Sequence, residues 1–352
     1  MNLRKVSLYL LCLTIGVLSC KKDDDPTPVV IEVRDRAEQQ LKDKDSLDKY
    51  LLTHYYNSGD FGDSNPNPSL SDIVLTKISL GGPIPDGHTL LKDAVGEPET
   101  ITFEDVIYEY YVLKLNQGGG NDSPKFSDKI RFNYEGFTLD DAVFDYSVNP
   151  FDSDLVGNGV STFGLIPGWR KVIPGFNTAE SYVENGDGTV SYMNKGLGIM
   201  FLPSGLAYFS SATTGIPAYS PIIFKFELLQ MAQNDHDGDG IPSYLEDLNG
   251  DGEFTLNYLD LTDVTDDNTD GDNSPDYIDL DDDGDGILTK NEIIISKITK
   301  STLEEVKSEP LAYNEVLLNK IVKEQNGDYT GTIITFKDTD GVKPFDYLDK
   351  NY

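Results

Sequence analysis

The acidic stretch from residue 234 to residue 292 constrains the fold of this chain more than any other segment. It contains twenty Asp or Glu residues and one Lys, so it carries −19 of the net charge of −33 of the 352-residue chain. Carboxylates at this density repel one another, and few apolar side chains remain to build a core. The stretch must therefore stay disordered or fold around cations. A charge of this sign also excludes nucleic acid as a favoured partner, since phosphates would be repelled.

Two twelve-residue repeats in this stretch have the pattern of calcium loops. Each repeat has carboxylates at positions 1, 3 and 5, Gly at position 6, an aliphatic residue offering its carbonyl at position 7, and a bidentate Glu at position 12. The pattern predicts structural Ca²⁺, with metal binding and folding as one event. The predicted ligands are Asp235, Asp237, Asp239, Ile241 and Glu246 in the first repeat, and Asp281, Asp283, Asp285, Ile287 and Glu292 in the second.

Degenerate copies lie between and beyond these two repeats. One keeps ligands at positions 1, 3, 5 and 12, namely Asn268, Asp270, Asp272 and Asp279. A copy starting at Asp247 has Tyr258 at position 12, and a copy starting at Asp338 has Val342 at position 5. Paired EF-hands are not expected, because residues 223–234 read as strand and loop and not as an entering helix. The repeats resemble thrombospondin type 3 calcium repeats, which wrap around a row of ions. An acidic disordered linker is the alternative.

The N-terminus has the pattern of a bacterial lipoprotein signal. Two basic residues precede an apolar run over residues 6–18, which is too short to span a bilayer comfortably but suits a signal-peptide core. Residues 17–20 (VLSC) resemble a lipobox, which implies cleavage before Cys20, acylation of its thiol and a lipid anchor in a bacterial outer membrane. The alternative is an ordinary signal peptide with an incidental cysteine. The only other cysteine is Cys12, inside the predicted signal, so no disulfide is expected.

The residues after the predicted anchor read as a tether and then a helix. Residues 21–26 (KKDDDP) resemble the surface-export signal of Bacteroidetes lipoproteins, although a solvated spacer is the simpler interpretation, so the membrane face stays open. Apolar residues at helical spacing predict one helix between Glu32 and Asn57, whole or broken near residues 43–45. It either packs on the domain that follows or acts as a spacer.

Residues 73–232 are dominated by strand patterns. Alternating apolar and aromatic residues predict strands at 73–80, 99–103, 106–115, 129–137, 199–202 and 222–229. A hairpin with a turn at residues 185–188 is expected within 181–193. Strands of this kind without βαβ alternation predict an α+β fold.

Five segments in this region, in chain order, resemble FKBP-type peptidyl-prolyl isomerases. They are residues 130–136 (IRFNYEG), 143–145 (VFD), 165–169 (LIPGW), 204–217 (SGLAY to GIP) and 222–229 (IIFKFELL). Residues 172–176 (VIPGF) are a rival to the third segment, but they would require a longer insertion. The resemblance covers about residues 104–232. It implies a twisted antiparallel sheet wrapped round a short helix, preceded by the N-terminal helix and followed by the acidic calcium repeats.

The resemblance also implies a pocket for a prolyl ring. Its walls would be Tyr134, Phe144, Leu165, Ile166, Trp169, Tyr208 and Phe224, with the Tyr208 hydroxyl and the Ile216 backbone binding substrate carbonyls and Asp145 facing the amide. Rotation about an X-Pro amide crosses a barrier of about 18–20 kcal/mol and needs no nucleophile. The alternative is that these aromatics only fill the core. Three departures stand out: residues 209–211 where the family has Gly, the insertion at 181–193, and the long spacing from Phe144 to Leu165.

These patterns together predict an envelope protein with six parts and two candidate functions. The parts are a signal peptide (1–19), a tether (20–33), an N-terminal helix with strands (34–103), an isomerase-like domain (104–232), calcium repeats (233–292) and an unassigned C-terminal segment (293–352). The first function is a membrane-anchored isomerase or foldase that acts on proline-containing polypeptides without a catalytic cofactor. The second is a non-enzymatic, calcium-stiffened surface-binding lipoprotein with a degenerate pocket.

Overall fold

The computed structural model describes residues 33–79, 82–147, 149–159, 163–257, 259–260 and 262–352. The predicted signal peptide, most of the tether and the predicted lipidation site at Cys20 lie outside the described residues. Residues 35–352 form one compact unit. Within the described ranges, no helix combines the length and the apolar character that crossing a membrane would require.

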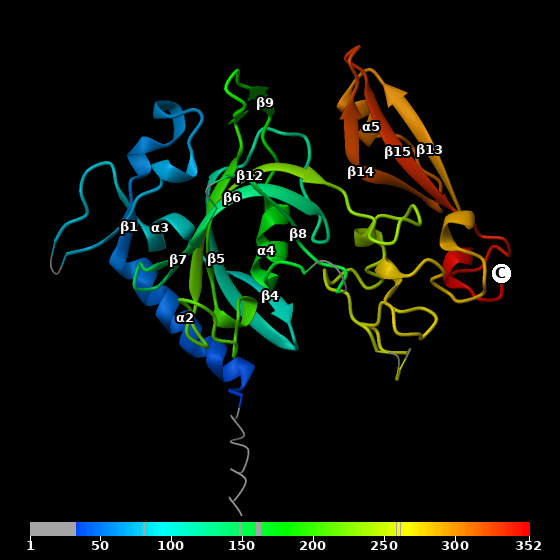
Figure 1. Cartoon of the computed structure of the whole chain (residues 1–352), viewed down its shortest axis with the longest axis horizontal. Coiled ribbons are helices and arrows are strands. Elements are labelled where there is room, and N and C mark those ends of the chain that lie inside the picture. The colour runs from blue at the N-terminus through cyan, green and yellow to red at the C-terminus, as the bar shows by residue number, and fades with distance from the viewer. Residues whose placement is uncertain (1–32, 80–81, 148, 160–162, 258, 261) are drawn as a thin grey trace, which may run out of the picture. The chain divides into compact units, whose positions relative to one another are not determined.

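A seven-stranded antiparallel sheet occupies the middle of this unit (Figure 1). Its strands, in spatial order, are β4 (Glu99–Phe103), β5 (Val106–Asn116), β11 (Gly196–Leu202), β12 (Ile222–Ala232), β6 (Lys129–Thr138) and β7 (Val143–Tyr146), with β8 (Phe151–Asp154) also paired to β6. The strands predicted from alternation are present here with slightly longer bounds. With few helices and mostly antiparallel sheets, the structure is an α+β arrangement.

Alternation along each strand sends side chains to two separate cores. On β12, Phe224 and Phe226 face the core that contains α4 (Pro167–Val172), whereas Ile223 faces the core that contains α2 (Arg36–Thr53). In Figure 1, α4 lies within the curve of the sheet and α2 lies on its other side. The helix α4 packs closely, because a Cβ at Gly168 would come within 2.3 Å of the Leu202 side chain. This period-two pattern explains why strand prediction succeeded.

The N-terminal helix α2 is unbroken and packs on the sheet, which settles both questions that the sequence left open. Its N-terminus is capped by Asp35, whose carboxylate accepts a hydrogen bond from the backbone N–H of Glu38 at 2.8 Å. Leu47 and Leu51, four residues apart, are fully buried against the sheet. Asp43 is buried as well, but its carboxylate is hydrogen-bonded, so the helix continues through it.

Two smaller strand groups flank the sheet. The first is a three-stranded sheet of β1 (His54–Tyr56), β2 (Leu75–Lys77) and β3 (Thr89–Leu90), followed by α3 (Leu91–Val95). The strand predicted at 73–80 shortens here to β2, because Ile73 is buried in the α2 core just after a 3₁₀ turn over 70–72. The second is the predicted hairpin, with β9 (Ser181–Glu184) and β10 (Val190–Met193).

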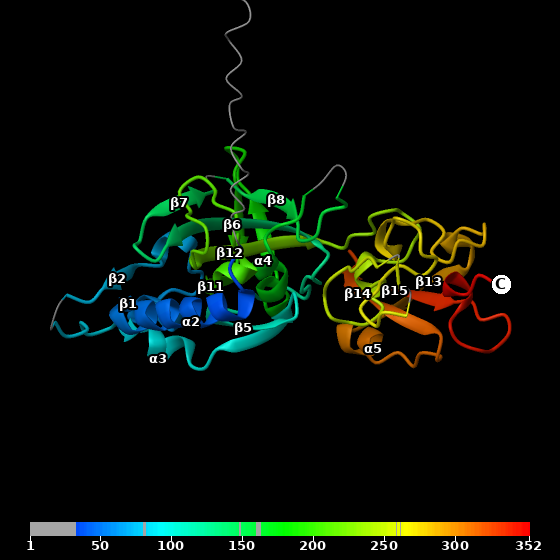
Figure 2. The same ribbon diagram turned by 90° about the horizontal axis from the view of Figure 1, so that it is seen from below.

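The acidic stretch and the C-terminal segment fold together. Among the described residues of 233–292, the regular elements are three short 3₁₀ turns. They are followed by a sheet of β13 (Ile293–Lys300), β14 (Glu315–Lys323) and β15 (Tyr329–Phe336) in the order β13-β15-β14, with α5 (Leu303–Lys307) against it (Figure 2). Ile241 from the acidic stretch and Tyr347 from the C-terminus share one apolar core with this sheet. The loops therefore supply part of the core that stabilises the sheet.

Candidate functional site

Four aromatic rings from different elements converge on one face of the main sheet. We call them the aromatic cluster: Tyr134 on β6, Phe144 on β7, Trp169 on α4 and Phe224 on β12. The Trp169 and Phe224 centroids are 5.0 Å apart, and Phe144 meets Phe224 edge-on at 5.5 Å. Tyr134 is edge-on to both Trp169 and Phe224 at 6.0 Å. The structure thus brings together side chains separated by up to ninety positions, in the tilted and edge-on geometry that aromatic pairs favour.

A glycine on β6 makes room for these rings. A Cβ at Gly136 would lie 2.5 Å from Cζ of Phe144 and 2.6 Å from Cε1 of Phe224. Such distances are far below van der Waals contact, so any side chain at this position would displace both rings. Gly136 therefore allows the aromatic cluster to form and should not tolerate substitution.

Burial decreases from the floor of the cluster to its rim. Trp169 and Phe224 are each 3% exposed. The half-buried rim consists of Tyr134, Phe144, Leu165, Ile166 and Tyr208, and Asp145 beside it is exposed. The set therefore joins the core of the main sheet to an apolar, half-exposed surface beside Asp145.

Polar groups at the rim are arranged around Asp145. The Tyr134 hydroxyl donates a hydrogen bond to Oδ2 of Asp145 at 2.8 Å. Burial, and then the negative charge of Asp145, raise the pKa values of both Tyr134 and Tyr208 above their usual range. Both phenols therefore remain protonated hydrogen-bond donors at neutral pH.

The loop after Tyr208 satisfies its own backbone groups. Ile216 is 2% exposed, and its N–H donates to the Thr213 carbonyl at 3.0 Å while its carbonyl accepts from the Thr213 N–H at 3.0 Å. A substrate carbonyl would have to compete with Thr213 for this N–H. Phe209, which stands where glycine was expected, has φ +44°, and its ring packs on Tyr219 at 5.2 Å and under the Arg36 guanidinium at 4.2 Å.

Asp43 on α2 holds this loop in place, and sequence reasoning missed it. Its Oδ2 accepts hydrogen bonds from the Ser204 backbone N–H at 2.7 Å and the Ser204 hydroxyl at 2.6 Å. Ser204 begins the turn that carries Tyr208. An Asp within a charged helix gives no local signal of such a role, because the partner is 161 residues away.

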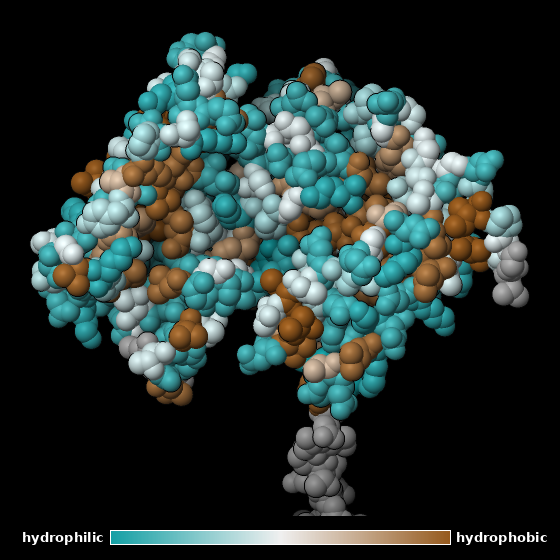
Figure 3. Space-filling model, turned by 180° about the vertical axis from the view of Figure 1, so that it is seen from behind, coloured by the Kyte–Doolittle hydropathy of each residue, from teal (hydrophilic) through white to brown (hydrophobic). Residues whose placement is uncertain are grey.

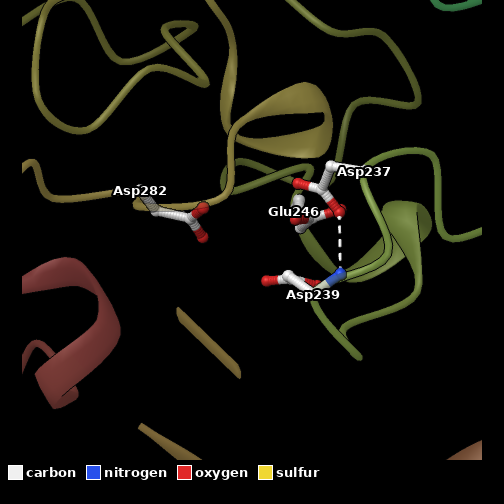
Figure 4. A group of neighbouring side chains, drawn as sticks. All are labelled: Asp237, Asp239, Glu246 and Asp282. Atoms are coloured by element: carbon white, nitrogen blue, oxygen red, sulfur yellow. Dashed lines mark hydrogen bonds between the residues drawn. The ribbon is translucent and has the colours of Figure 1, made fainter. Parts of the chain in front are cut away.

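Carboxylates of the acidic stretch gather into a second candidate site. The carboxylate cluster is Asp237, Asp239, Glu246 and Asp282, each offering an oxygen within 4.8 Å of the others (Figure 4). The predicted Asp235 lies outside this group, and its oxygens accept from the N–H groups of Gly238 at 2.7 Å and Gly240 at 3.1 Å. Asp282 was not predicted as a ligand, because it occupies position 2 of its own repeat.

Six of the other predicted ligands fall into two further groups. One contains Asp270, Asp272 and Asp279, and the other contains Asp281, Asp283 and Asp285. Asn268 accepts a hydrogen bond from the Gly271 N–H at 3.1 Å, and Glu292 is 4% exposed with Oε2 unpartnered in the described structure. Ile241 and Ile287 each donate their N–H to the carboxylate two residues before, at 2.7 and 2.6 Å.

Four repeats share one backbone design, including the copy at 338–349 that the sequence showed as degenerate. In each, the N–H at position 9 donates to the carbonyl before position 1: Ser243 to Asn234, Asp276 to Asp267, Thr289 to Leu280, and Asp346 to Lys337, at 2.8–3.1 Å. The position 9 side chain then accepts from the N–H at position 2. The repeat starting at Asp247 differs, because Asp267 takes the place of the position 9 side chain.

The carboxylate cluster fits a hard cation. Both carboxylate oxygens of Glu246 and of Asp282 are buried without a hydrogen-bond partner in the described structure, as is Oδ2 of Asp239. Buried charges of one sign are costly unless something neutralises them. Burial, followed by the charges of neighbouring carboxylates, raises the pKa of Asp237 to about 8 and that of Asp239 to about 7. Oxygen-only ligands of this kind suit Ca²⁺.

These raised pKa values predict opposite effects of pH with and without metal. In chelator, raising the pH from 5 to 8 should destabilise the acidic segment, because the folded form holds protons that the unfolded form, with pKa values near 3.8, has released. With excess Ca²⁺ the same change should stabilise it, since the metal binds deprotonated carboxylates. Urea unfolding followed by circular dichroism at both pH values measures this. Greater stability at pH 8 in chelator would contradict the prediction.

Comparisons with known proteins match parts of the chain. The model of a family described as BamM C-terminal matches residues 236–324. No curated protein matches the chain. Among solved structures, a peptidyl-prolyl cis-trans isomerase from Pseudomonas syringae pv. tomato is 20% identical at a TM-score of 0.29, covering 40% of this chain and 82% of that one. FkpA from Escherichia coli is 25% identical at a TM-score of 0.28, covering 38% of this chain and about half of that one, 51%.

Proposed function

We propose that this protein is a peptidyl-prolyl cis-trans isomerase, acting as a foldase on proline-containing polypeptides in the bacterial cell envelope. The observation that carries the proposal is the aromatic cluster, in which a buried floor of Trp169 and Phe224 is surrounded by a half-exposed apolar rim. A prolyl ring is apolar and compact, so it matches such a surface. The resemblance of five sequence segments to FKBP-type isomerases supports the same assignment.

Catalysis would be non-covalent. The planar amide is stabilised by charge separation. Apolar surroundings disfavour this charge-separated planar form relative to the twisted form. The protonated Tyr208 hydroxyl would donate to a substrate carbonyl. Asp145, held by Tyr134, would face the amide from the exposed side. Interactions that strengthen as the amide twists would lower the barrier.

A protease-coupled assay on an Ala-Pro peptide tests the proposal. Removal of the donor in Tyr208→Phe should reduce kcat/KM about tenfold, which corresponds to about 1.4 kcal/mol of transition-state stabilisation. Asp145→Asn should lower it in the same direction. Tyr192→Phe is a matched control, because its hydroxyl lies on the β9–β10 hairpin near Gln230. Absence of turnover in the unaltered protein at high concentration would refute the assignment.

We propose the outer membrane as the location and Ca²⁺ as a structural ion. The lipobox pattern at residues 17–20 supports a lipid anchor on Cys20, and the BamM C-terminal family match supports an association with the outer membrane. The buried, unpartnered oxygens of Glu246 and Asp282 support cation binding.

The face of the molecule shown in Figure 3 is mostly hydrophilic, with separate apolar patches.

A non-enzymatic binding function is the second candidate. Its supporting observation is the loop after Tyr208, where the Ile216 N–H is already bonded to Thr213 and Phe209 replaces the expected glycine. Such a site could bind proline-containing segments without accelerating rotation. Peptide binding measured by titration, combined with no turnover in the same assay, would favour this function over the enzyme.

A further inference from the structure

Asp282 has an unusual place among the four equivalent repeats. It stands at position 2, where the other repeats have His236, Thr269 and Thr339. Its backbone N–H donates to the position 9 side chain of its repeat, the Thr289 hydroxyl, at 3.2 Å, as the position 2 N–H does in the other three repeats. Its side chain, however, does not join Asp281, Asp283 and Asp285, the carboxylates of its own repeat. It lies instead among Asp237, Asp239 and Glu246 of the repeat that begins at Asp235, 47 positions before Asp282.

The Asp282 carboxylate is buried and unneutralised. It is 1% exposed, and neither of its oxygens has a hydrogen-bond partner in the described structure. Glu246 opposite is 0% exposed, and both of its oxygens are likewise unpartnered. Figure 4 shows the Asp282 carboxylate turned toward Asp239 and Glu246. Two buried carboxylates that face each other without donors must be neutralised, and a cation between them does this while both stay deprotonated.

We propose that one Ca²⁺ ion is shared between two repeats, with Asp282 of repeat 281–292 completing a site formed by Asp237, Asp239 and Glu246 of repeat 235–246. This inference rests on the calcium binding proposed above, but it adds a ligand and a connection that the repeat pattern does not contain. The site is made of oxygens alone, because the ring of nearby His236 is occupied by the Ser243 hydroxyl and the Val156 carbonyl.

The chemistry of the group favours calcium over other cations. Four carboxylates can offer up to eight oxygens, which matches the six to eight ligands of Ca²⁺. Mg²⁺ prefers six ligands with several retained waters, and such waters do not suit side chains as buried as Glu246 and Asp282. Zn²⁺ favours His and Cys ligands, and the group has neither.

A shared ion links binding in one repeat to folding of the other. Repeat 281–292 leads directly into β13, which begins at Ile293, and Ile293 packs with Ile241 of the first repeat. The ion would therefore join the beginning of the acidic stretch to the beginning of the C-terminal sheet. Occupation of the first site should depend on the second repeat being folded, so the two sites should fill in a coupled manner.

Calcium titration of Asp282→Asn in the full chain tests the proposal. After removal of metal, isothermal titration with Ca²⁺ should show that one ion binds at least tenfold more weakly than in the unaltered protein. Glu246→Gln should weaken the same ion, and the double variant should lose that one ion and no other, because both side chains serve one site. The remaining sites keep their ligands Asp281, Asp283 and Asp285.

A matched control separates the ligand role from loss of charge. Asp260→Asn removes one negative charge from an exposed position in the same stretch, and its affinity for Ca²⁺ should stay within about twofold of the unaltered protein. Near-UV circular dichroism at saturating Ca²⁺ verifies that each variant is folded. If Asp282→Asn titrates like Asp260→Asn while Glu246→Gln loses an ion, the shared site is wrong and calcium binding stands. If the unaltered protein binds no Ca²⁺, both proposals fail.

Discussion

Chelation of calcium is expected to make residues 235–349 sensitive to protease while the seven-stranded sheet remains resistant. The acidic repeats have no extended hydrogen-bonded element of their own among the described residues of 233–292, only 3₁₀ turns. Without cations, the carboxylates of three separate groups would repel one another at close range. The main sheet has two apolar cores that do not depend on these groups.

The expected size of this effect is large. Each ion that binds only the folded form contributes about 2.7 kcal/mol when its concentration is a hundred times Kd. Three occupied groups would then contribute about 8 kcal/mol, which is comparable to the whole stability of a typical domain. The C-terminal sheet should loosen along with the repeats, because its core includes Ile241 and Tyr347 from two of them.

Limited proteolysis with fragment masses determined by mass spectrometry measures this effect. Cuts should appear within the acidic stretch and the C-terminal sheet in chelator, and should be suppressed by Ca²⁺ but not by the same concentration of Mg²⁺. Fluorescence of Trp169, the only Trp in the chain, provides an internal reporter of the acidic stretch. Lys171, two residues after it, bonds the Gly252 carbonyl at 3.0 Å and Glu253 at 2.6 Å. Identical fragments with and without chelator would contradict the prediction.

The sequence predicted those features that depend on local pattern. Alternation predicted the strands of the main sheet. The two faces of this sheet pack against different helices, so successive residues of β12 point into different cores. The short helix was expected to follow Trp169, over residues 170–176, whereas α4 begins earlier, at Pro167, as proline at a first helical position favours. Ligand spacing predicted most members of the carboxylate groups, because a twelve-residue loop brings its own positions together whatever surrounds it.

Features that depend on distant segments meeting could not be predicted. Asp43 reads as a solvent-facing residue of a charged helix, and only the approach of Ser204 gives it a partner. Asp282 reads as a spacer between two ligands, and only the packing of one repeat on another turns it into a member of a buried group. The prediction of a backbone contact at Ile216 likewise took no account of Thr213, whose position is set by the fold of the loop.

Trp169→Ala is expected to reduce both stability and the proposed activity. The indole is 3% exposed and lies against Phe132 at 4.8 Å, Phe224 at 5.0 Å and Phe226 at 5.7 Å. Its removal leaves a large cavity in a close-packed core, so the free energy of unfolding should fall by about 3–5 kcal/mol. Because the indole also forms the floor of the aromatic cluster, turnover of an Ala-Pro peptide should fall to background.

Phe176→Ala separates these two effects, because Phe176 belongs to the same core but not to the aromatic cluster. It is 1% exposed and meets Phe226 edge-on at 4.9 Å, so its truncation should cost a similar 3–5 kcal/mol, roughly, in the free energy of unfolding. The free energies of unfolding of the two variants are compared by urea unfolding followed by circular dichroism, because Trp169→Ala has no Trp fluorescence to follow. At a temperature where both are fully folded, Phe176→Ala should retain most of its turnover. Equal loss of turnover in the two variants would mean that Trp169 acts through the core alone, and the surface above it would then have no demonstrated part in amide rotation.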